Sequence, residues 1–202
     1  IRYVALTNTL NWVAKRVVDV TGSFVGILLS SPLMLAAAVS IKLTSKGPVI
    51  FKQERVGLHN KNFKMYKFRT MEMQKPTAEQ KGWTVKDDPR VTKIGKLLRR
   101  TSLDELPQLF NILMGDMSLV GPRPERPQFV EKFKEEIPRY MIKHQVRPGL
   151  TGWAQINGYR GDTSIRKRIE YDLFYIENWS MAFDFRIMFL TIFKGFINKN
   201  AY

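Results

Sequence analysis

The sequence predicts an α+β protein that is mostly helical, with a re-entrant membrane helix–break–helix, a small β-hairpin and interfacial amphipathic helices. Three observations predict this fold class. Residues 20–41 contain no charged residue, residues 48–56 and 62–70 are rich in β-formers around a short polar turn, and residues 181–199 are apolar but interrupted by charges. The first and last segments favour helices at a membrane, and the middle pair favours a hairpin.

One domain accounts for the length of the chain. The 202 residues are enough for one hydrophobic core, and no internal repeat or low-complexity tract divides them. We expect a single domain over residues 1–202, with the membrane helix at 17–42, a globular part at 48–180 and the interfacial helix at 181–199. Because the chain begins with isoleucine rather than methionine, we also expect it to be part of a longer protein.

The composition excludes several kinds of site. The chain has no cysteine, which excludes disulfides, thiolate zinc sites and a cysteine nucleophile. Its two histidines, His59 and His144, are too few to favour a zinc site built on several histidines or a serine–histidine triad. Any catalysis is therefore expected to use carboxylates, lysine, arginine, hydroxyls or a bound metal ion.

The net charge of +15 predicts an anionic partner. Nucleic acid, an acidic membrane surface and phosphorylated ligands all fit this charge. The chain carries no recognisable nucleic-acid-binding motif, and the uncharged run at residues 20–41 argues against such a binder. We therefore expect membrane lipids and phosphorylated ligands as partners, and no nucleic acid.

The uncharged run at residues 20–41 is as long as a helix that crosses a bilayer, which needs roughly 20 residues. Pro32 lies near its middle and favours a break, and the hydroxyls of Ser30 and Ser31 can bond the backbone groups that a break frees. Each half would be only about 16–18 Å long. Both flanks are basic, which places both ends on the cytoplasmic side: Arg2, Lys15, Arg16, Lys42 and Lys46. We predict a re-entrant helix, with a buried, kinked core helix and a simple span as the alternatives.

The two β-rich segments predict a hairpin. Residues 48–56 (PVIFKQERV) and 62–70 (NFKMYKFRT) flank the turn GLHNK, and the second arm is basic through Lys64, Lys67 and Arg69. After it, residues 74–88 are polar and read as a loop, and residues 91–100 read as a short helix with a basic side.

The apolar segment at residues 181–199 is interrupted by Asp184, Arg186, Lys194 and Lys199. Aromatic and aliphatic side chains interspersed with basic ones are typical of a helix that lies in a membrane interface. An ordinary buried helix is the alternative.

Residues 99–126 carry the pattern most suggestive of chemistry. Asp104 and Glu105 are adjacent, with Arg99 on one side and Arg123 on the other. Guanidinium groups suit phosphate, and Mg²⁺ binds through one or two carboxylates together with phosphate oxygens. The structural alternative is a capping box, in which Ser102 caps a helix and Glu105 reaches back. Taken alone, the pair favours that structural role.

Two proline-flanked arginines extend this pattern. Arg123 lies between two prolines in Gly-Pro-Arg-Pro, and Arg147 precedes Pro148 and Gly149. A stiff backbone suits a bidentate contact with phosphate, so both are candidates for phosphate or nucleotide binding. A rigid turn with an exposed arginine is the alternative at each position.

At these residues the chain resembles the bacterial sugar transferases, the monotopic polyprenyl-phosphate hexose-1-phosphate transferases (phosphoglycosyl transferases). The matching segments cover nearly the whole chain, in order: KRVVDVTGS at 15–23, Ser31-Pro32, KFRTM at 67–71, DPRVTKIGKLLRRTSLDELPQL at 88–109, GDMSLVGPRP at 115–124, RPGLTGWAQING at 147–158 and YDLFYIENWS at 171–180. In this family Ser31-Pro32 marks the break of a re-entrant membrane helix.

The resemblance implies a transferase. A UDP-hexose would donate hexose 1-phosphate to undecaprenyl phosphate, giving a polyprenyl diphosphate sugar and UMP. This is the first membrane step in making an exopolysaccharide, capsule, O-antigen or similar glycan. The tail after residue 158 resembles the glucose- and galactose-transferring members, with glucose preferred. The family also implies the bacterial inner (cytoplasmic) membrane, an active site on its cytoplasmic face, and transmembrane helices before this domain in the longer members; a homo-oligomer stays open.

The resemblance also implies roles for individual residues. Asp104 would be the nucleophile that carries a covalent phosphosugar, and Glu105, together with Asp104, would bind Mg²⁺. The substrate phosphates and nucleotide would be held by Arg99, Arg123, Lys67, Arg69 and Arg147. Two alternatives stay open: direct attack of the lipid phosphate in a ternary complex, with Asp104 only a metal ligand or base, and a non-catalytic membrane-bound module that binds anions.

Overall fold

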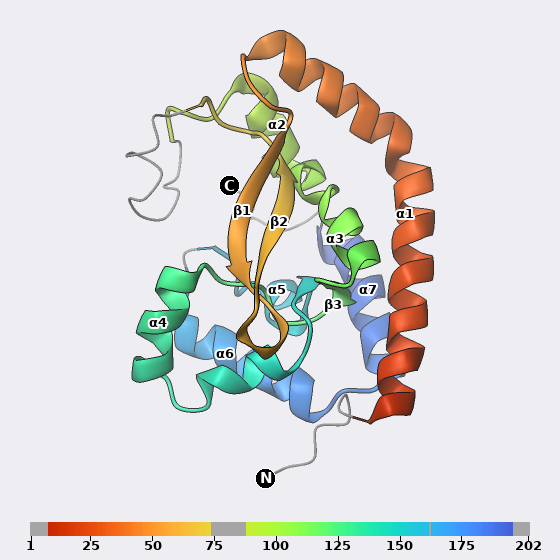
Figure 1. Ribbon diagram of the computed structural model, residues 1–202, viewed down its shortest axis with the longest axis vertical. Helices are drawn as coiled ribbons and strands as arrows, with labels where there is room; N and C mark the ends of the chain where they lie inside the picture. The colour runs from red at the N-terminus through yellow and green to blue at the C-terminus, as the bar shows by residue number, and fades with distance from the viewer. Residues whose placement is uncertain (1–7, 74–87, 162, 196–202) are drawn as a thin grey trace.

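The computed structural model describes residues 8–73, 88–161 and 163–195. In chain order, the helices and strands are α1 (Thr9–Thr44), β1 (Ile50–Val56), η2 (Leu58–Asn60), β2 (Asn62–Phe68), α2 (Lys93–Arg100), η4 (Leu103–Glu105), α3 (Gln108–Met114), β3 (Ser118–Val120), α4 (Pro127–Glu136), η5 (Tyr140–Gln145), β4 (Gly149–Thr151), α5 (Trp153–Ile156), α6 (Ile165–Glu177) and α7 (Met181–Gly195), where η marks a 3₁₀ turn. Figure 1 shows α1 along one side of the molecule, the β1–β2 hairpin in the middle, and α4 and α6 on the side away from α1. The structure is mostly helical, as the sequence predicts, and it contains two small sheets.

Helix α1 is continuous across Pro32. The amide that proline lacks would have bonded to the carbonyl of Leu28, and the Ser31 hydroxyl donates to that carbonyl instead, at 2.8 Å. The Ser30 hydroxyl likewise donates to the carbonyl of Gly26, at 2.6 Å. Figure 1 shows the helix bending in its C-terminal part. The structure therefore has a bent, continuous helix where the sequence predicted a break, because the Ser31 hydroxyl satisfies the carbonyl that proline frees.

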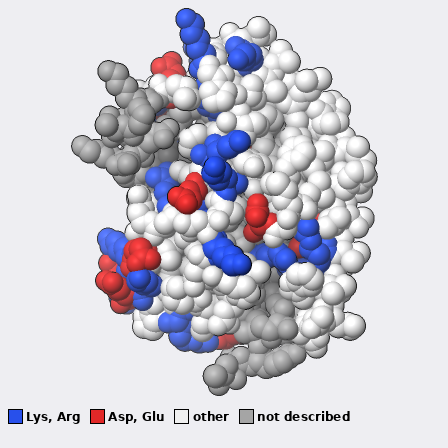
Figure 2. Space-filling model, viewed as in Figure 1, with Lys and Arg blue, Asp and Glu red and all other residues white. Residues whose placement is uncertain are grey.

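The apolar surface of α1 is largely exposed. Its most apolar 18-residue window has a mean hydropathy of 2.1 with only 11% of its residues buried, so the alternative of a buried core helix is wrong. Leu29, Leu35 and Leu43 are among its most exposed side chains. Figure 2 shows an almost uncharged surface on the side that α1 occupies. Within the described residues, α1 alone is long and apolar enough to cross a membrane, which fits membrane association.

Polar side chains fasten the N-terminal part of α1 to the globular part. The ammonium of Lys15 pairs with Asp184 of α7 at 2.5 Å, and both groups are buried. The carboxylate of Asp19 accepts hydrogen bonds from the hydroxyl of Ser118 and the amide of Leu119, each at 2.9 Å. Near its other end, α1 packs through Ala37 and Ile41 on residues of β2 and α2. The helix is thus fastened near both ends, its middle packs on α3 through Ile27, and its opposite side is apolar and exposed.

The predicted hairpin is confirmed. β1 and β2 pair antiparallel from Ile50 opposite Phe68 to Val56 opposite Asn62. His59 and Asn60 in the connection have left-handed backbone conformations, with φ of 52° and 60°, which turn the chain back. The pairing brings the basic second arm, including Lys67, into the middle of the molecule.

Helix α2 confirms the short helix expected over residues 91–100, since it begins at Lys93 after a Thr92 cap. The loop expected at residues 74–88 lies outside the described residues except for Asp88. A two-stranded parallel sheet of β3 and β4 was not predicted, because three-residue strands carry almost no periodic signal.

Helix α7 confirms a helix within residues 181–199 as far as Gly195, where the description ends. Asp184 and Ile187 are buried against the globular part, while Phe185, Phe189 and Phe193 are each more than half exposed. An aromatic face that the protein leaves uncovered is typical of a helix in a membrane interface.

His144 makes the stability depend on pH. It is buried beside Tyr140 and, among the described residues, neither ring nitrogen has a hydrogen-bond partner. Burial, aided by Lys143, lowers the pKa of His144 from its usual 6.5 to about 4. Below pH 6.5 this histidine binds a proton in the unfolded chain but stays neutral in the folded protein. Its contribution to the free energy of unfolding is therefore fully present above pH 6.5 and is lost as the pH falls toward 4.

We therefore expect the free energy of unfolding to fall by up to about 3 kcal/mol between pH 6.5 and 4 through this group. The variant His144→Phe keeps a ring against Tyr140 but cannot titrate, so its unfolding temperature should vary less over this range. Thermal unfolding of both proteins in detergent at several pH values measures the difference. Parallel pH profiles for the two proteins would contradict this role of His144.

Candidate active site

The predicted carboxylate pair lies on the 3₁₀ turn η4, between α2 and α3. Ser102 precedes it in a left-handed conformation with φ of 56°, and its side chain caps no helix. The expected capping box is therefore wrong: Pro107 delays the following helix to Gln108, so η4 ends before α3 begins. Asp104 and Glu105 are nevertheless buried, at 7% and 6% exposure. A capping box therefore does not explain why two adjacent carboxylates lie here.

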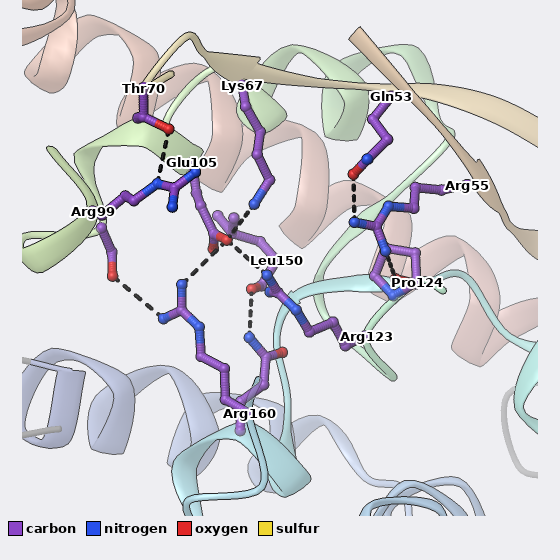
Figure 3. Close-up of polar contacts among 12 residues, drawn as sticks. Gln53, Arg55, Lys67, Thr70, Arg99, Glu105, Arg123, Pro124, Leu150 and Arg160 are labelled. Carbon is purple, nitrogen blue, oxygen red and sulfur yellow. Dashed lines mark hydrogen bonds and ion pairs between the residues drawn. The ribbon is translucent and has the colours of Figure 1, made fainter. Parts of the chain in front are cut away.

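One oxygen of Glu105 binds three cations (Figure 3). The Oε1 atom of Glu105 lies 2.8 Å from Lys67 Nζ, 2.8 Å from Arg123 Nη2 and 3.2 Å from Arg160 Nη2. Lys67 comes from β2, Arg123 from the segment after β3, and Arg160 from the segment after α5. Three positive groups from three parts of the chain thus converge on one buried carboxylate oxygen.

Sequence reasoning missed Arg160. Besides binding Glu105, its Nη1 donates to the hydroxyl of Ser102 at 3.3 Å. Gly158 and Gly161, with φ of 88° and 71°, allow the tight local path that carries Arg160. These two flanking glycines were the signal in the sequence that could have pointed to Arg160, because they indicate a tight backbone path rather than an ordinary surface loop.

The two carboxylates have opposite pKa shifts. Burial raises the pKa of Asp104 above its usual value, although nearby Lys67 opposes this rise. Burial acts on Glu105 in the same direction, but Arg123 and Lys67 outweigh it and hold its pKa well below the usual range. Among the described residues, no hydrogen bond or ion pair engages the side chain of Asp104. Glu105 is thus committed to its cations, whereas Asp104 is a buried carboxylate with its oxygens available.

Arg99 joins this cluster from the last turn of α2. Its Nε donates to the hydroxyl of Thr70 at 2.8 Å, and burial lowers its pKa while Asp104 and Asp88 partly restore it. Figure 3 shows the bond between Arg99 and Thr70. The predicted residues Asp104, Glu105, Lys67, Arg99 and Arg123 therefore lie together.

The remaining predicted residues lie elsewhere. Arg69 donates to the carbonyls of Lys46 and Ser45 and so caps the C-terminal end of α1. Arg147 donates to the carbonyl of Gly115 at 2.8 Å and lies over the ring of Trp12, with 4.8 Å from its Cζ to the ring centroid. Ser31 and Pro32 lie within α1, where the hydroxyl of Ser31 bonds backbone rather than the cluster.

The site suits an anionic ligand and a shared metal ion better than a metal held by protein alone. Within the described ranges, no group of three or more histidine, cysteine, aspartate or glutamate side chains could hold a metal ion. Asp104 and Glu105 supply two carboxylates, and Mg²⁺ commonly binds one or two carboxylates together with substrate phosphate oxygens. The donors present therefore fit a Mg²⁺ ion that phosphate completes.

Known proteins resemble this chain over almost its whole length. The UDP-glucose:undecaprenyl-phosphate glucose-1-phosphate transferase of Klebsiella pneumoniae is 51% identical over 199 residues, which cover 96% of this chain and 43% of that protein. The UDP-N-acetylgalactosamine-undecaprenyl-phosphate N-acetylgalactosaminephosphotransferase of Aeromonas hydrophila is also 51% identical, over 88% of this chain and 42% of that protein. The chain spans less than half the length of these two relatives.

A third relative is of similar length to this chain. Exopolysaccharide production protein PSS of Rhizobium leguminosarum bv. phaseoli is 44% identical over 91% of this chain and 95% of that protein. The family described as bacterial sugar transferase matches residues 10–198, a range that contains all of α1 except its first residue, the hairpin and every residue of the cluster around Glu105. The chain therefore belongs to the bacterial sugar transferase family.

Proposed function

We propose that this protein transfers hexose 1-phosphate from a UDP-hexose to undecaprenyl phosphate, giving undecaprenyl diphosphate hexose and UMP. The observation that carries the proposal is a buried Asp104, whose side chain has no hydrogen-bond or ion-pair partner among the described residues, beside a Glu105 whose Oε1 binds Lys67, Arg123 and Arg160. This arrangement puts a nucleophile next to a group of cations that suits a diphosphate. The names of the two relatives with 51% identity describe transfers of this class.

In the first step, a carboxylate oxygen of Asp104 attacks the phosphorus that bears the sugar. An acyl-phosphate bond forms, the bond from this phosphorus to the oxygen of UMP breaks, and UMP leaves with the electron pair. In the second step, an oxygen of undecaprenyl phosphate attacks the same phosphorus and releases the Asp104 carboxylate. UMP can thus leave before the bulky lipid enters.

The cations serve the phosphate oxygens. Lys67, Arg123 and Arg160 hold Glu105 in the free protein, so their side chains are already ordered when the substrate diphosphate arrives. Arg99, which interacts electrostatically with Asp104, adds a fourth positive group. Asp104 and Glu105 would hold Mg²⁺. When bound, the ion would neutralise part of the negative charge on the diphosphate.

We further propose that the protein is monotopic in the bacterial inner membrane with its active site on the cytoplasmic face. The exposed apolar stretch of α1, the basic residues at both of its ends and the aromatic face of α7 support this placement. The bend at Pro32 would let α1 enter one leaflet and return. The soluble nucleotide sugar and the phosphate of the lipid would then meet at the same membrane surface.

Both ends of α1 are expected to face the cytoplasm. Because the chain contains no cysteine, single variants Thr9→Cys and Lys46→Cys report the two ends without background. A membrane-impermeant maleimide should label both in inside-out vesicles and neither in intact spheroplasts, with the cysteine-free protein as the unlabelled control. Labelling of the two ends from opposite sides of the membrane would contradict the re-entrant helix and support a helix that spans the membrane once.

The activity itself is tested by UMP release. The purified chain in detergent receives Mg²⁺ and UDP-glucose, UDP-galactose or UDP-N-acetylgalactosamine, with or without undecaprenyl phosphate. We expect steady UMP release only with lipid, fastest with UDP-glucose. Without lipid, a burst of up to one UMP per protein supports the covalent route, whereas no burst supports direct attack by the lipid phosphate. No UMP with any donor would favour a non-catalytic module that binds anions.

A further inference from the structure

A buried arginine outside the cluster links two of the segments that supply its cations. Arg168 lies on α6 and is 2% exposed. Its Nη1 donates to Glu125 Oε1 at 2.8 Å, and its Nη2 donates to the carbonyl of Gly161 at 2.5 Å. Glu125 follows Arg123 by two residues, and Gly161 directly follows Arg160. One guanidinium thus bonds both segments that present an arginine to Glu105.

The segment with Arg123 is held along its backbone as well. The carbonyl of Arg123 accepts from Lys143 Nζ at 3.1 Å, and the carbonyl of Pro124 accepts from Arg55 Nη1 at 3.0 Å. The carbonyl of Glu125 accepts from the amide of Val56 in β1, at 3.0 Å. This segment is therefore a fixed reference in the fold, bonded at three consecutive carbonyls.

The segment with Arg160 is bonded at its backbone to α5 and to itself. The amide of Tyr159 donates to the carbonyl of Ala154 in α5, and the amide of Arg160 donates to the carbonyl of Gly158. The ring of Tyr159 also packs on Tyr171 of α6. Besides the shared contact with Glu105, this segment is linked to the fixed segment by Arg168, whose Nη2 also lies 3.3 Å from the hydroxyl of Thr163. The position of Arg160 relative to Arg123 thus depends on a group that touches neither side chain.

We propose that Arg168 is a positioning residue that sets the spacing of Arg123 and Arg160 around Glu105, and so the fit of the site to the diphosphate of its substrate. The inference rests on the proposed function. A planar guanidinium presents two nitrogens in a fixed fork and can bond two acceptors at a set separation, whereas an ammonium is a single point charge. Lysine at this position would keep the ion pair with Glu125 but lose the bond to Gly161.

The test is the variant Arg168→Lys in the UMP-release assay with UDP-glucose. We expect its KM for UDP-glucose to rise about tenfold with kcat changed less than about threefold, because a displaced Arg160 weakens ground-state binding of the diphosphate. Hydrogen exchange gives a readout that needs no catalysis: the amides at residues 157–161 should exchange faster in Arg168→Lys. An unchanged KM with unchanged exchange overturns the proposal.

Two control variants separate positioning from loss of stability. Ile187→Val removes a methyl group from a fully buried side chain in α7 and should lower the unfolding temperature while leaving KM and exchange at residues 157–161 unchanged. Arg139→Lys makes the same chemical change at an exposed ion pair with Glu177 and should alter neither measurement. If Ile187→Val raised KM as much as Arg168→Lys, the role of Arg168 would be structural only.

A second variant covers failure of Arg168→Lys to fold. Glu125→Asp keeps the charge opposite Arg168 but draws it back by one methylene, which strains the same bridge from its other end. Its KM should rise in the same direction, and a wild-type KM in this variant contradicts the proposal. Absence of UMP release from the unmodified chain would instead overturn the proposed function, so the two failures are distinguishable.

Discussion

The variant Asp104→Asn is expected to lower the rate of UMP release by about 10⁴-fold or more while the protein stays folded. An amide of the same shape cannot attack phosphorus as a carboxylate does. Folding should not suffer, because no described side chain pairs with Asp104 and burial already disfavours its charged form, raising its pKa. We expect an unfolding temperature equal to or above that of the unmodified chain.

This combination of results identifies a nucleophile. The rate is measured with both substrates present, and the lipid-independent burst of UMP should disappear as well. Asp116→Asn, at a partly exposed aspartate that contacts Asn111, is the matched control and should keep its activity. If Asp104→Asn kept more than a tenth of the rate, Asp104 would be neither nucleophile nor base.

The variant Glu105→Gln should behave differently, because it removes the carboxylate on which three cations converge. Lys67, Arg123 and Arg160 would then lie close together without the charge that compensates them. Breaking a buried ion pair at one partner costs about 3–5 kcal/mol. We expect the free energy of unfolding to fall by about 3 kcal/mol and the rate of UMP release to fall by about 10²-fold or more.

Thermal or denaturant unfolding in detergent measures the first change, and the UMP assay measures the second. Glu54→Gln is the control, since Glu54 is exposed on β1 and accepts a hydrogen bond only from the Asn62 side chain among its described contacts. It should change neither quantity appreciably. A Glu105→Gln protein as stable as the unmodified chain would mean that the three cations repel one another less than their spacing implies.

The hairpin was predictable because its signals are local. Two β-rich arms flank GLHNK and lie within a few residues of the turn that they specify. The carboxylate pair and its flanking arginines were also found from sequence, since Asp104, Glu105, Arg99 and Arg123 lie within one short stretch. Lys67 required the family resemblance, because an alternating basic strand does not reveal which lysine turns inward.

The contacts of three arginines could not be predicted from the sequence, for a shared physical cause. A guanidinium on a long flexible side chain reaches far from its backbone, so the surroundings of Arg69 and Arg147 follow from tertiary packing rather than from neighbouring residues. Both guanidinium groups donate hydrogen bonds to backbone carbonyls, near the ends of α1 and α3. Arg160 was not predicted because its partner Glu105 lies 55 residues earlier in the chain.

The attachment of α1 to the globular part has a consequence for the proposed lipid substrate. Lys15 and Asp19 fix one end of the helix to α7 and β3, and Ala37 and Ile41 fix the other beside α2, which leads into the turn that bears Asp104. The helix and the nucleophile therefore move as one rigid piece. In the proposed monotopic arrangement, the depth of α1 among the acyl chains would set the height of Asp104 above them. A thinner or thicker bilayer would then move the phosphate of the proposed lipid substrate relative to Asp104 without any change in the protein.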